Sequence, residues 1–203
     1  MNCTAAVAQY VADSNTKTQL PGSLNRAKYC VLDWIANVFA GVNEHGTQKV
    51  ADLSRYFGDR EQCTVAGFHN RFPLFVAALA NGTSASALDF DDIVSYEPGH
   101  TTATVVAASL ALGEQRRIDG SRLLNAIICG VQVMNSIGAA VMPLHYKIGW
   151  HNTSTMGHFG AVAACASVLQ LTDAQVRRAL GIVSSSVAGT QENSGTMTKP
   201  FHS

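Results

Sequence analysis

The sequence predicts a mostly α-helical protein, all-α in class: a multi-helix bundle with one small β-hairpin near residues 62–73. Apolar residues recur at three- and four-residue steps along most of the chain, and a β pattern is confined to one short segment. Alanine, glycine and serine are abundant in the later helical segments. Small residues let helix backbones approach closely, which favours a compact bundle over a solenoid.

Two helices are predicted before residue 42. Residues 3–13 form a short amphipathic helix, and residues 20–41 form a longer one, with Ser23 placed to cap it and Gly41 placed to stop it. The apolar face of the longer helix is expected to be Leu24, Ala27, Val31, Trp34, Ile35 and Val38.

The β candidate follows a third helix, expected from about Thr47 to Phe57 and ending at Gly58. Residues 63–66 are a short strand, and the turn signals over residues 67–73 indicate a hairpin. The turn also holds two polar side chains that we interpret as surface residues, His69 and Arg71.

Five more helices are predicted after the hairpin. They cover residues 73–86, 101–116, 120–141, 154–170 and 172–188. In the last of them, Thr172 is placed to cap and Gln175 occupies the capping-box position. Residues 123–142 are the most membrane-like stretch, but their polar side chains would be costly in hydrocarbon, so a buried helix explains them better.

Composition narrows the class of protein. The 203 residues include 14 basic and 14 acidic side chains, so there is no basic excess to indicate a nucleic-acid partner. The N-terminus lacks the pattern of a signal peptide, and no membrane partner is expected. Five cysteines without a CxxC spacing are typical of buried thiols in a reducing compartment. We therefore expect a cytoplasmic protein of about one domain.

One short polar segment interrupts the alanine-rich pattern. It holds Asp89, Asp91, Asp92, Glu97 and His100. Crowded carboxyl groups repel one another, so one of them can titrate high enough to exchange protons. His100 lies at the edge of the next helix, where Thr101 or Thr102 can cap and the helix end offers amides to an anion. The alternative is a solvated acidic loop with a helix cap.

Two more segments carry side chains suited to chemistry. In "GWHNTSTMGH", His151 and His158 share a face if the helix begins before His151; otherwise His151 precedes the helix. Asn152, Thr153 or Ser154 would then cap, and a histidine held in a capping network is the alternative. In "NSGTMTKPFHS", with Lys199 and His202, the lysine matters only if it points into the same cavity as the others.

Several classes of site are disfavoured. No HxH, HExxH or paired-cysteine spacing occurs, so a metal site is not predicted, and an Asp/His site assembled from distant loops is the alternative. The phosphate loop GxxxxGK and the hydrolase motif GxSxG are both missing from the sequence.

Taken in order, the polar segments resemble the MmgE/PrpD family, which includes 2-methylcitrate dehydratase and is similar to cis-aconitate decarboxylase. The matching pieces are "LPGSLNRAKYCVLDWIANVFAG", "AALANGTSASALDFDD", "GH" before an alanine-rich helix ending "ALGE", "GWHNTSTMGHFGAVAACASVLQL" and "TKPFH". They are collinear and cover nearly the whole chain, and their order is specific for the family rather than for one activity within it.

The resemblance implies a large all-α domain followed by a smaller α+β lid domain, in a homodimer. Full-length members are more than twice as long, so residues 1–203 are expected to be the N-terminal part of the helical domain, truncated at its C-terminal end and without the lid. No cofactor is required by the chemistry that follows.

The resemblance also implies a site. Its positions correspond here to Asp89, Ile93, His100, His151 and Lys199. Ile93 stands where relatives often have threonine, and "EPGHTTA" stands where they commonly have "HPS", so substrate contacts are expected to differ there. Three further residues are predicted to bind substrate: Asp92, Thr101 and His158.

The expected reaction is acid/base lyase chemistry on a citrate-like tricarboxylate, either dehydration, as in propionate metabolism, or decarboxylation. We expect His100 and His151 to transfer protons, Lys199 to pair with a substrate carboxylate, and Asp89 to orient or tune a histidine. Two alternatives remain open: an isomerase or epimerase of a small dicarboxylate, and a non-catalytic truncated helical domain that serves in dimer contact.

Overall fold

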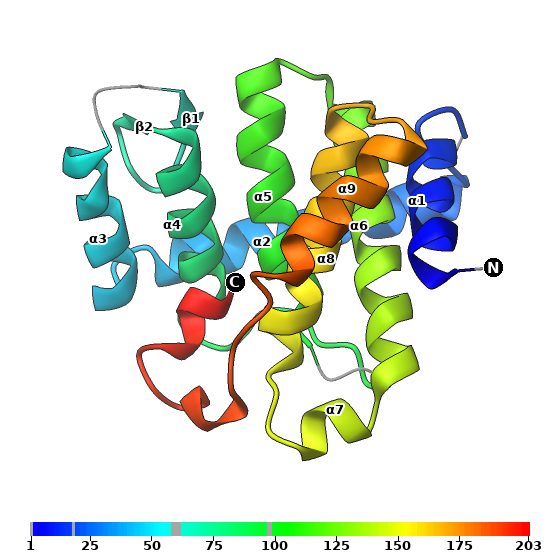
Figure 1. The fold of residues 1–203 in the computed structure, drawn as a ribbon. Coiled ribbons are helices and arrows are strands. Elements are labelled where there is room, and N and C mark those ends of the chain that lie inside the picture. Colours follow the sequence, from blue (N-terminus) through cyan, green and yellow to red (C-terminus); the bar gives the residue numbers. More distant parts are fainter. Residues whose placement is uncertain (1, 18, 58–61, 97–98) are drawn as a thin grey trace.

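Helices make up most of the chain, and strands are confined to one small hairpin, as predicted (Figure 1). The structure is a computed structural model that describes residues 2–17, 19–57, 62–96 and 99–203. Its α-helices are α1 (Cys3–Ser14), α2 (Pro21–Gly41), α3 (His45–Asp52), α4 (Leu74–Ser86), α5 (Thr101–Arg116), α6 (Gly120–Val141), α7 (Leu144–Lys147), α8 (Asn152–Val168) and α9 (Asp173–Ser184). Three 3₁₀ turns are η1 (Leu53–Tyr56), η2 (Gln191–Asn193) and η3 (Lys199–His202). Gly58 and Glu97, which entered the predictions above, lie outside the described residues.

The bundle is organised around α5, α6 and α8. Helix α8 packs against both α5 and α6. Helix α5 also packs against α4, and α4 packs against α2 and α3. Helices α1 and α9 pack against each other at the opposite end of the molecule from α3 (Figure 1). The C-terminal turn η3 packs against α4, so the end of the chain lies beside the segment that follows α4.

The hairpin pairs β1 (Cys63–Thr64) with β2 (Arg71–Phe72) in antiparallel register. It is joined to α5, because the backbone N–H and the hydroxyl of Thr64 each donate to the Glu114 carboxylate at 2.7 Å. Arg71 is exposed, as predicted, but it lies in β2 rather than in the turn, 3.6 Å from Glu114.

Several predicted helix ends were wrong for identifiable reasons. Helix α2 begins at Pro21, whose missing N–H and fixed φ suit the first helical position, so Ser23 lies inside the first turn and caps nothing. Helix α3 begins at His45 and tightens into η1 after Asp52. Helix α9 ends at Ser184, four residues before the predicted end, and its Gln175 side chain accepts the Thr172 N–H at 2.9 Å, as the capping box predicts.

The apolar face of α2 is mostly as predicted. Ala27, Trp34 and Val38 are buried in the core, whereas Ile35 is exposed. The outer face of this helix carries further exposed apolar side chains, among them Tyr29, Leu32 and Phe39.

Helix α6 has the length and apolar composition to cross a membrane, alone among the described helices. Here it packs against α2, α5 and α8, which agrees with the predicted buried helix. All five cysteines are free thiols, but the predicted burial is only partly right: Cys63 and Cys129 are buried, whereas Cys3 is exposed.

Glycines set the distance between helices at two crossings. Gly41 ends α2, but it is needed for packing, because an added Cβ would collide with the carbonyl oxygen of Ser84 on α4. Where α6 crosses α8, a Cβ on Gly130 would lie 2.7 Å from the carbonyl oxygen of Gly160. Backbone atoms move less readily than side chains, so these positions admit no larger residue without separating the helices.

The α6–α8 crossing supports a stability prediction. We expect Gly130→Ala to lower the free energy of unfolding by about 1–3 kcal/mol, although alanine favours helices, because overpacking dominates. The matched control is Gly181→Ala in α9, where an added Cβ meets nothing within 4 Å. That change is expected to stabilise by up to about 1 kcal/mol, and urea unfolding of both variants measures the difference. An unchanged or increased stability in Gly130→Ala would contradict the close crossing.

Candidate active site

A polar cluster forms where the segment after α4, the N-termini of α5 and α8, and η3 meet. Its titratable members are Asp89, Asp91, His100, His151, Lys199 and His202. These residues come from three distant parts of the sequence, and the packing of η3 against α4 brings the last part to the first.

Two histidines stand at the starts of helices. His100 is the residue before α5 and His151 the residue before α8, both with extended backbone. The first amides of a helix have no intrahelical partner, so both side chains lie beside groups that favour anions. The two helix starts are connected, because the His100 N–H donates to Thr153 Oγ1 at 2.9 Å.

The predicted capping at these starts was partly wrong. His151 does precede its helix, as predicted, but Asn152, Thr153 and Ser154 lie in the first turn of α8 and none of them caps it.

At α5 the cap comes from the preceding loop: Asp92 Oδ1 accepts the Thr102 N–H at 3.1 Å. Neither Thr101 nor Thr102 caps by its own hydroxyl, and the buried Thr101 donates its hydroxyl to Asn135 on α6 at 3.2 Å. Burial raises the pKa of Asp92, and the bonds from Thr102 oppose this only in part.

Lys199 lies at the centre of the cluster. Its ammonium donates to Asp89 Oδ1 and lies 3.3 Å from His100 Nε2. The Lys199 side chain is 10% exposed and that of Asp89 is 65% exposed, so the ion pair is open to solvent on its carboxylate side. Burial raises the pKa of Asp89, but the hydrogen bond and charge of Lys199 outweigh it and hold this pKa below its ordinary value.

Asp89 also has an unusual backbone. Its φ is 59°, in the left-handed region, which aspartate tolerates better than most residues. Among the described non-glycine residues, Arg117 and Gln170 share this conformation, and both follow helix ends. At Asp89 the same conformation directs the chain after α4 into the site segment.

His100 is held by a buried carboxylate. Its Nδ1 lies 3.2 Å from Asp91 Oδ1 and 3.2 Å from the Asp91 carbonyl oxygen, and Asp91 Oδ2 accepts the Ser86 hydroxyl at 2.7 Å. Both oxygens near Nδ1 are acceptors, so Nδ1 carries the hydrogen and Nε2 faces Lys199 and Asp89. Burial lowers the pKa of His100, but the hydrogen bond and charge of Asp91 outweigh it and raise this pKa overall.

The pKa of His151 is shifted in the opposite direction, downward. His151 is buried, and its Nδ1 lies 2.7 Å from Nδ1 of His202. Burial, followed by the nearby charges of His202 and Lys199, lowers the pKa of His151 to about 4. The pKa of His202 is lowered by burial and by Lys199. Near neutral pH this pair is therefore uncharged.

The cluster thus holds an acid and a base side by side. Titratable groups whose pKa values are driven apart are typical of acid/base sites. A proton can leave from His100 and be accepted at His151, while the Lys199 ammonium and the two helix starts attract carboxylates.

The cluster also holds side chains of the types that bind metal ions. Among the described residues, one group offers three ligand atoms close together: Asp89, Asp91 and His100. The nearest ring nitrogen is Nε2 for Asp89, at 3.4 Å, and Nδ1 for Asp91, at 3.2 Å. The Lys199 ammonium occupies the Asp89 carboxylate, so an ion bound there would have to displace it.

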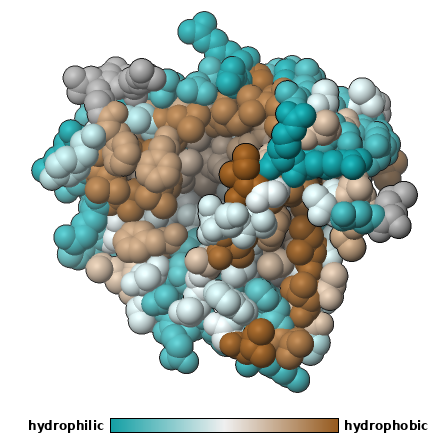
Figure 2. Space-filling view, in the orientation of Figure 1, coloured by the Kyte–Doolittle hydropathy of each residue, from teal (hydrophilic) through white to brown (hydrophobic). Residues whose placement is uncertain are grey.

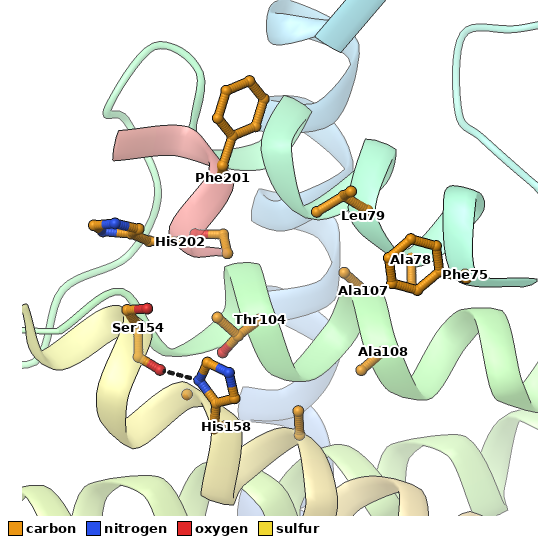
Figure 3. A pocket seen from close by; sticks show the side chains of 13 residues that line it. Phe75, Ala78, Leu79, Thr104, Ala107, Ala108, Ser154, His158, Phe201 and His202 are labelled. Carbon is orange, nitrogen blue, oxygen red and sulfur yellow. Dashed lines mark hydrogen bonds between the residues drawn. The ribbon is translucent and has the colours of Figure 1, made fainter. Parts of the chain in front are cut away.

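A mostly apolar cavity of about 270 Å³ lies beside the cluster, between α4, α5, α8 and η3. Figure 3 shows Phe75 and Leu79 on one side of it and His158 on another, while the His202 ring points away from Phe75. Figure 2 shows apolar side chains gathered around a hollow on this face. His158 donates from Nδ1 to the Ser154 carbonyl at 2.6 Å (Figure 3).

The structure therefore brings together four residues predicted as catalytic: Asp89, His100, His151 and Lys199. Of the three residues predicted to bind substrate, Asp92 and Thr101 lie at the start of α5 beside the cluster, where Asp92 caps the helix and Thr101 contacts α6. His158 lines the adjacent cavity. Their roles in binding substrate stay predictions. Ile93 is exposed in the segment after α4.

Sequence reasoning missed Asp91, Ser86 and His202 as members of the site. Asp91 was visible only as one acid among several, and no local pattern separates it from its neighbours. His202 had a signal, since it follows Lys199 by three residues, and in a 3₁₀ turn side chains three apart point the same way.

The chain is similar to several curated proteins that share one name. The chain is 29% identical to cis-aconitate decarboxylase of Mus musculus over 190 residues, which are 89% of this chain and 38% of that protein. It is 29% identical to the Aspergillus terreus (strain NIH 2624 / FGSC A1156) enzyme of the same name, over 92% of this chain and 39% of that protein. The Homo sapiens cis-aconitate decarboxylase is 28% identical over 88% of this chain and 38% of its own length.

The chain thus spans about two fifths of the length of the curated relatives it matches. The model of the MmgE/PrpD N-terminal domain matches residues 5–203. By this match and by the collinear segments described above, the chain belongs to the MmgE/PrpD family.

Proposed function

We propose that this chain carries the acid/base residues of a lyase site for a citrate-like tricarboxylate, and that cis-aconitate is decarboxylated there. The observation that carries the proposal is the position of His100, whose Nε2 lies 3.3 Å from the buried Lys199 ammonium while its Nδ1 lies 3.2 Å from the buried Asp91 carboxylate. The decarboxylase names of the relatives favour cis-aconitate as the substrate.

Substrate binding would begin at Lys199. Because the Asp89 side chain is largely exposed, it can turn into solvent and leave the ammonium to a substrate carboxylate. The uncapped start of α8 would attract a further carboxylate.

Proton delivery would come from His100. Loss of CO₂ leaves an electron pair on carbon, and the protonated His100 can give its Nε2 proton to that carbon. Asp91 at Nδ1 favours the charged form of the imidazole before transfer, which raises the fraction of His100 that carries the proton.

Dehydration of a 2-methylcitrate-like acid is the second candidate. It needs a base to remove a proton from carbon and an acid to protonate the departing hydroxyl, whereas decarboxylation needs only the acid. The neutral His151 beside the loaded His100 is the observation that favours this candidate.

The test offers cis-aconitate and 2-methylcitrate to the purified chain in parallel. CO₂ release from cis-aconitate supports decarboxylation, and growth of an ultraviolet signal from 2-methylcitrate supports dehydration. Calorimetry measures tricarboxylate binding separately from turnover. We expect His100→Ala to lower turnover of either acid about 10²–10⁴-fold, the usual contribution of general acid catalysis.

His151→Ala separates the two candidates. It is expected to lower dehydration by a similar factor and decarboxylation much less, since decarboxylation does not use the base. Silence on both acids together with no detectable tricarboxylate binding would contradict the lyase proposal.

Two expectations from the sequence remain proposals: a homodimer and a cytoplasmic location. The exposed apolar face of α2, with Tyr29, Leu32 and Phe39, gives a homodimer an available contact surface. Light scattering of the purified chain measures the oligomeric state, and Leu32→Asp is expected to lower any dimer fraction.

A further inference from the structure

We infer that His202 is a positioning residue for His151: it fixes the tautomer of His151 through the Nδ1–Nδ1 hydrogen bond and exchanges protons with it. The geometric part of this inference stands on the structure alone. Its catalytic meaning rests on the second candidate of the proposed function, dehydration, in which His151 removes a proton from the substrate.

The contact between the two Nδ1 atoms requires that they share one hydrogen. The two Nδ1 atoms lie 2.7 Å apart, and the ring centroids lie 4.9 Å apart. A hydrogen bond between two ring nitrogens needs one hydrogen on one nitrogen and a lone pair on the other. His151 therefore has its Nδ1 committed to His202, and only Nε2 remains for chemistry.

The backbone of His151 is held independently of its ring. Its N–H donates to the Gly189 carbonyl at 3.1 Å, and its carbonyl accepts the Thr155 hydroxyl and N–H, each at 3.0 Å. The bond to His202 is thus the contact in the structure that sets the ring's protonation pattern. It acts like the second partner that orients a catalytic histidine in other sites.

The position of His202 follows from the short turn η3. Lys199 begins this turn and His202 ends it, and side chains three residues apart in a 3₁₀ turn lie on the same side. One turn therefore holds both partners of the site: Lys199 contacts His100, and His202 contacts His151. The charged and titratable groups that face the pair are Lys199, His100 and Asp89.

The difference in burial determines which of the two histidines is protonated first. His151 is buried and its pKa lies at about 4, whereas His202 is half-buried. An added proton is therefore accepted first by His202, which then donates its Nδ1–H to His151 Nδ1. In that arrangement the remaining hydrogen of His151 is on Nε2, which is also the state reached once His151 has taken a proton there.

The proton step balances. In dehydration, His151 takes a proton from the substrate carbon at Nε2 and passes its Nδ1 hydrogen to Nδ1 of the neutral His202, whose own hydrogen is on Nε2. His202 becomes charged and later releases one proton to solvent, and His151 is neutral before and after.

The test uses ¹⁵N imidazole shifts of the purified chain, which report tautomer and pKa whether or not the chain turns over. In the wild type we expect His151 in a single tautomer and a first protonation on His202. His202→Phe removes the bond and the nearby charge, so the pKa of His151 is expected to rise from its value of about 4 and both tautomers to appear. His202→Asn keeps a neutral hydrogen-bond partner, so it is expected to raise the pKa while preserving one tautomer.

The matched control is His69→Asn, an exposed histidine in the hairpin, which should leave the shifts of His151 unchanged. Independent titration of His151 and His202 in the wild type, or a tautomer mixture that His202→Phe does not alter, would overturn the inference. Where turnover is detected, His202→Asn is expected to lower kcat about tenfold or more with little change in KM. Failure of the lyase assay alone leaves the ¹⁵N result intact, so the two proposals fail separately.

Discussion

Replacing Lys199 by methionine is expected to abolish detectable turnover while leaving the fold intact. The change removes the buried ammonium that would hold a substrate carboxylate, and the loss of a charge-assisted contact in a desolvated site is expected to lower turnover about 10³-fold. It also removes a positive charge that lowers the pKa of both His151 and His202, so both pKa values are expected to rise.

The free energy of unfolding shows whether Lys199→Met loses turnover because the ammonium is missing or because the protein unfolds. Breaking a buried ion pair is usually costly because one charge stays buried, but here the remaining partner, Asp89, is largely exposed and can be solvated. Methionine fills a similar volume, so we expect the free energy of unfolding to change by about 1 kcal/mol or less. The matched control is Lys147→Met on α7, an exposed lysine outside the cluster. Tricarboxylate binding that survives Lys199→Met unweakened would contradict the role given to the ammonium.

Much of the fold could be predicted from sequence because helices in a bundle leave a periodic apolar pattern. The face of α2 with Ala27, Trp34 and Val38 follows that pattern, and the hairpin at β1 and β2 follows from turn residues. Helix starts were less predictable, since they depend on which partner reaches the free amides. Asp92 caps α5 from the preceding loop, and no spacing rule for local caps would have found it.

The candidate site, too, was predictable from sequence only in part. Motif order selected Asp89, His100, His151 and Lys199, which the fold does bring together. What the sequence could not supply is the direction in which each histidine is tuned. His100 and His151 are the same residue type at equivalent places before helices. Their pKa values differ because one faces a buried carboxylate and the other faces a second histidine.

The lowered pKa of His151 predicts how stability depends on pH. The unfolded chain protonates His151 near pH 6.5, whereas the folded chain does so near pH 4. Between these values the unfolded state binds more protons, so stability falls as the pH is lowered through this window. The full shift corresponds to roughly 3 kcal/mol. Burial lowers the pKa of His145 and His202 as well, and both act in the same direction.

His100 has the opposite effect, because it makes stability fall as the pH rises. The fall in stability below pH 6.5 is called the acid limb, and the fall above it is the second limb. The folded pKa of His100 is raised, so its contribution is fully present below about pH 6.5 and is lost as the pH rises through the folded value. Asp89, with a lowered pKa, loses its contribution only below its ordinary value of 3.8, which is outside the window set by His151. Stability is therefore expected to be greatest near pH 6.5, where the two histidine limbs meet.

Urea unfolding at intervals between pH 4 and pH 8 measures both limbs, and one substitution assigns the acid limb. His151→Asn keeps a side chain able to hydrogen-bond His202 but removes the titration, so it is expected to flatten the acid limb by roughly 3 kcal/mol and leave the limb above pH 6.5 in place. The control His69→Asn is expected to retain both limbs. An acid limb of the same depth in His151→Asn would mean that other groups cause it, and that His151 is not the suppressed base on which the acid/base pairing with His100 depends.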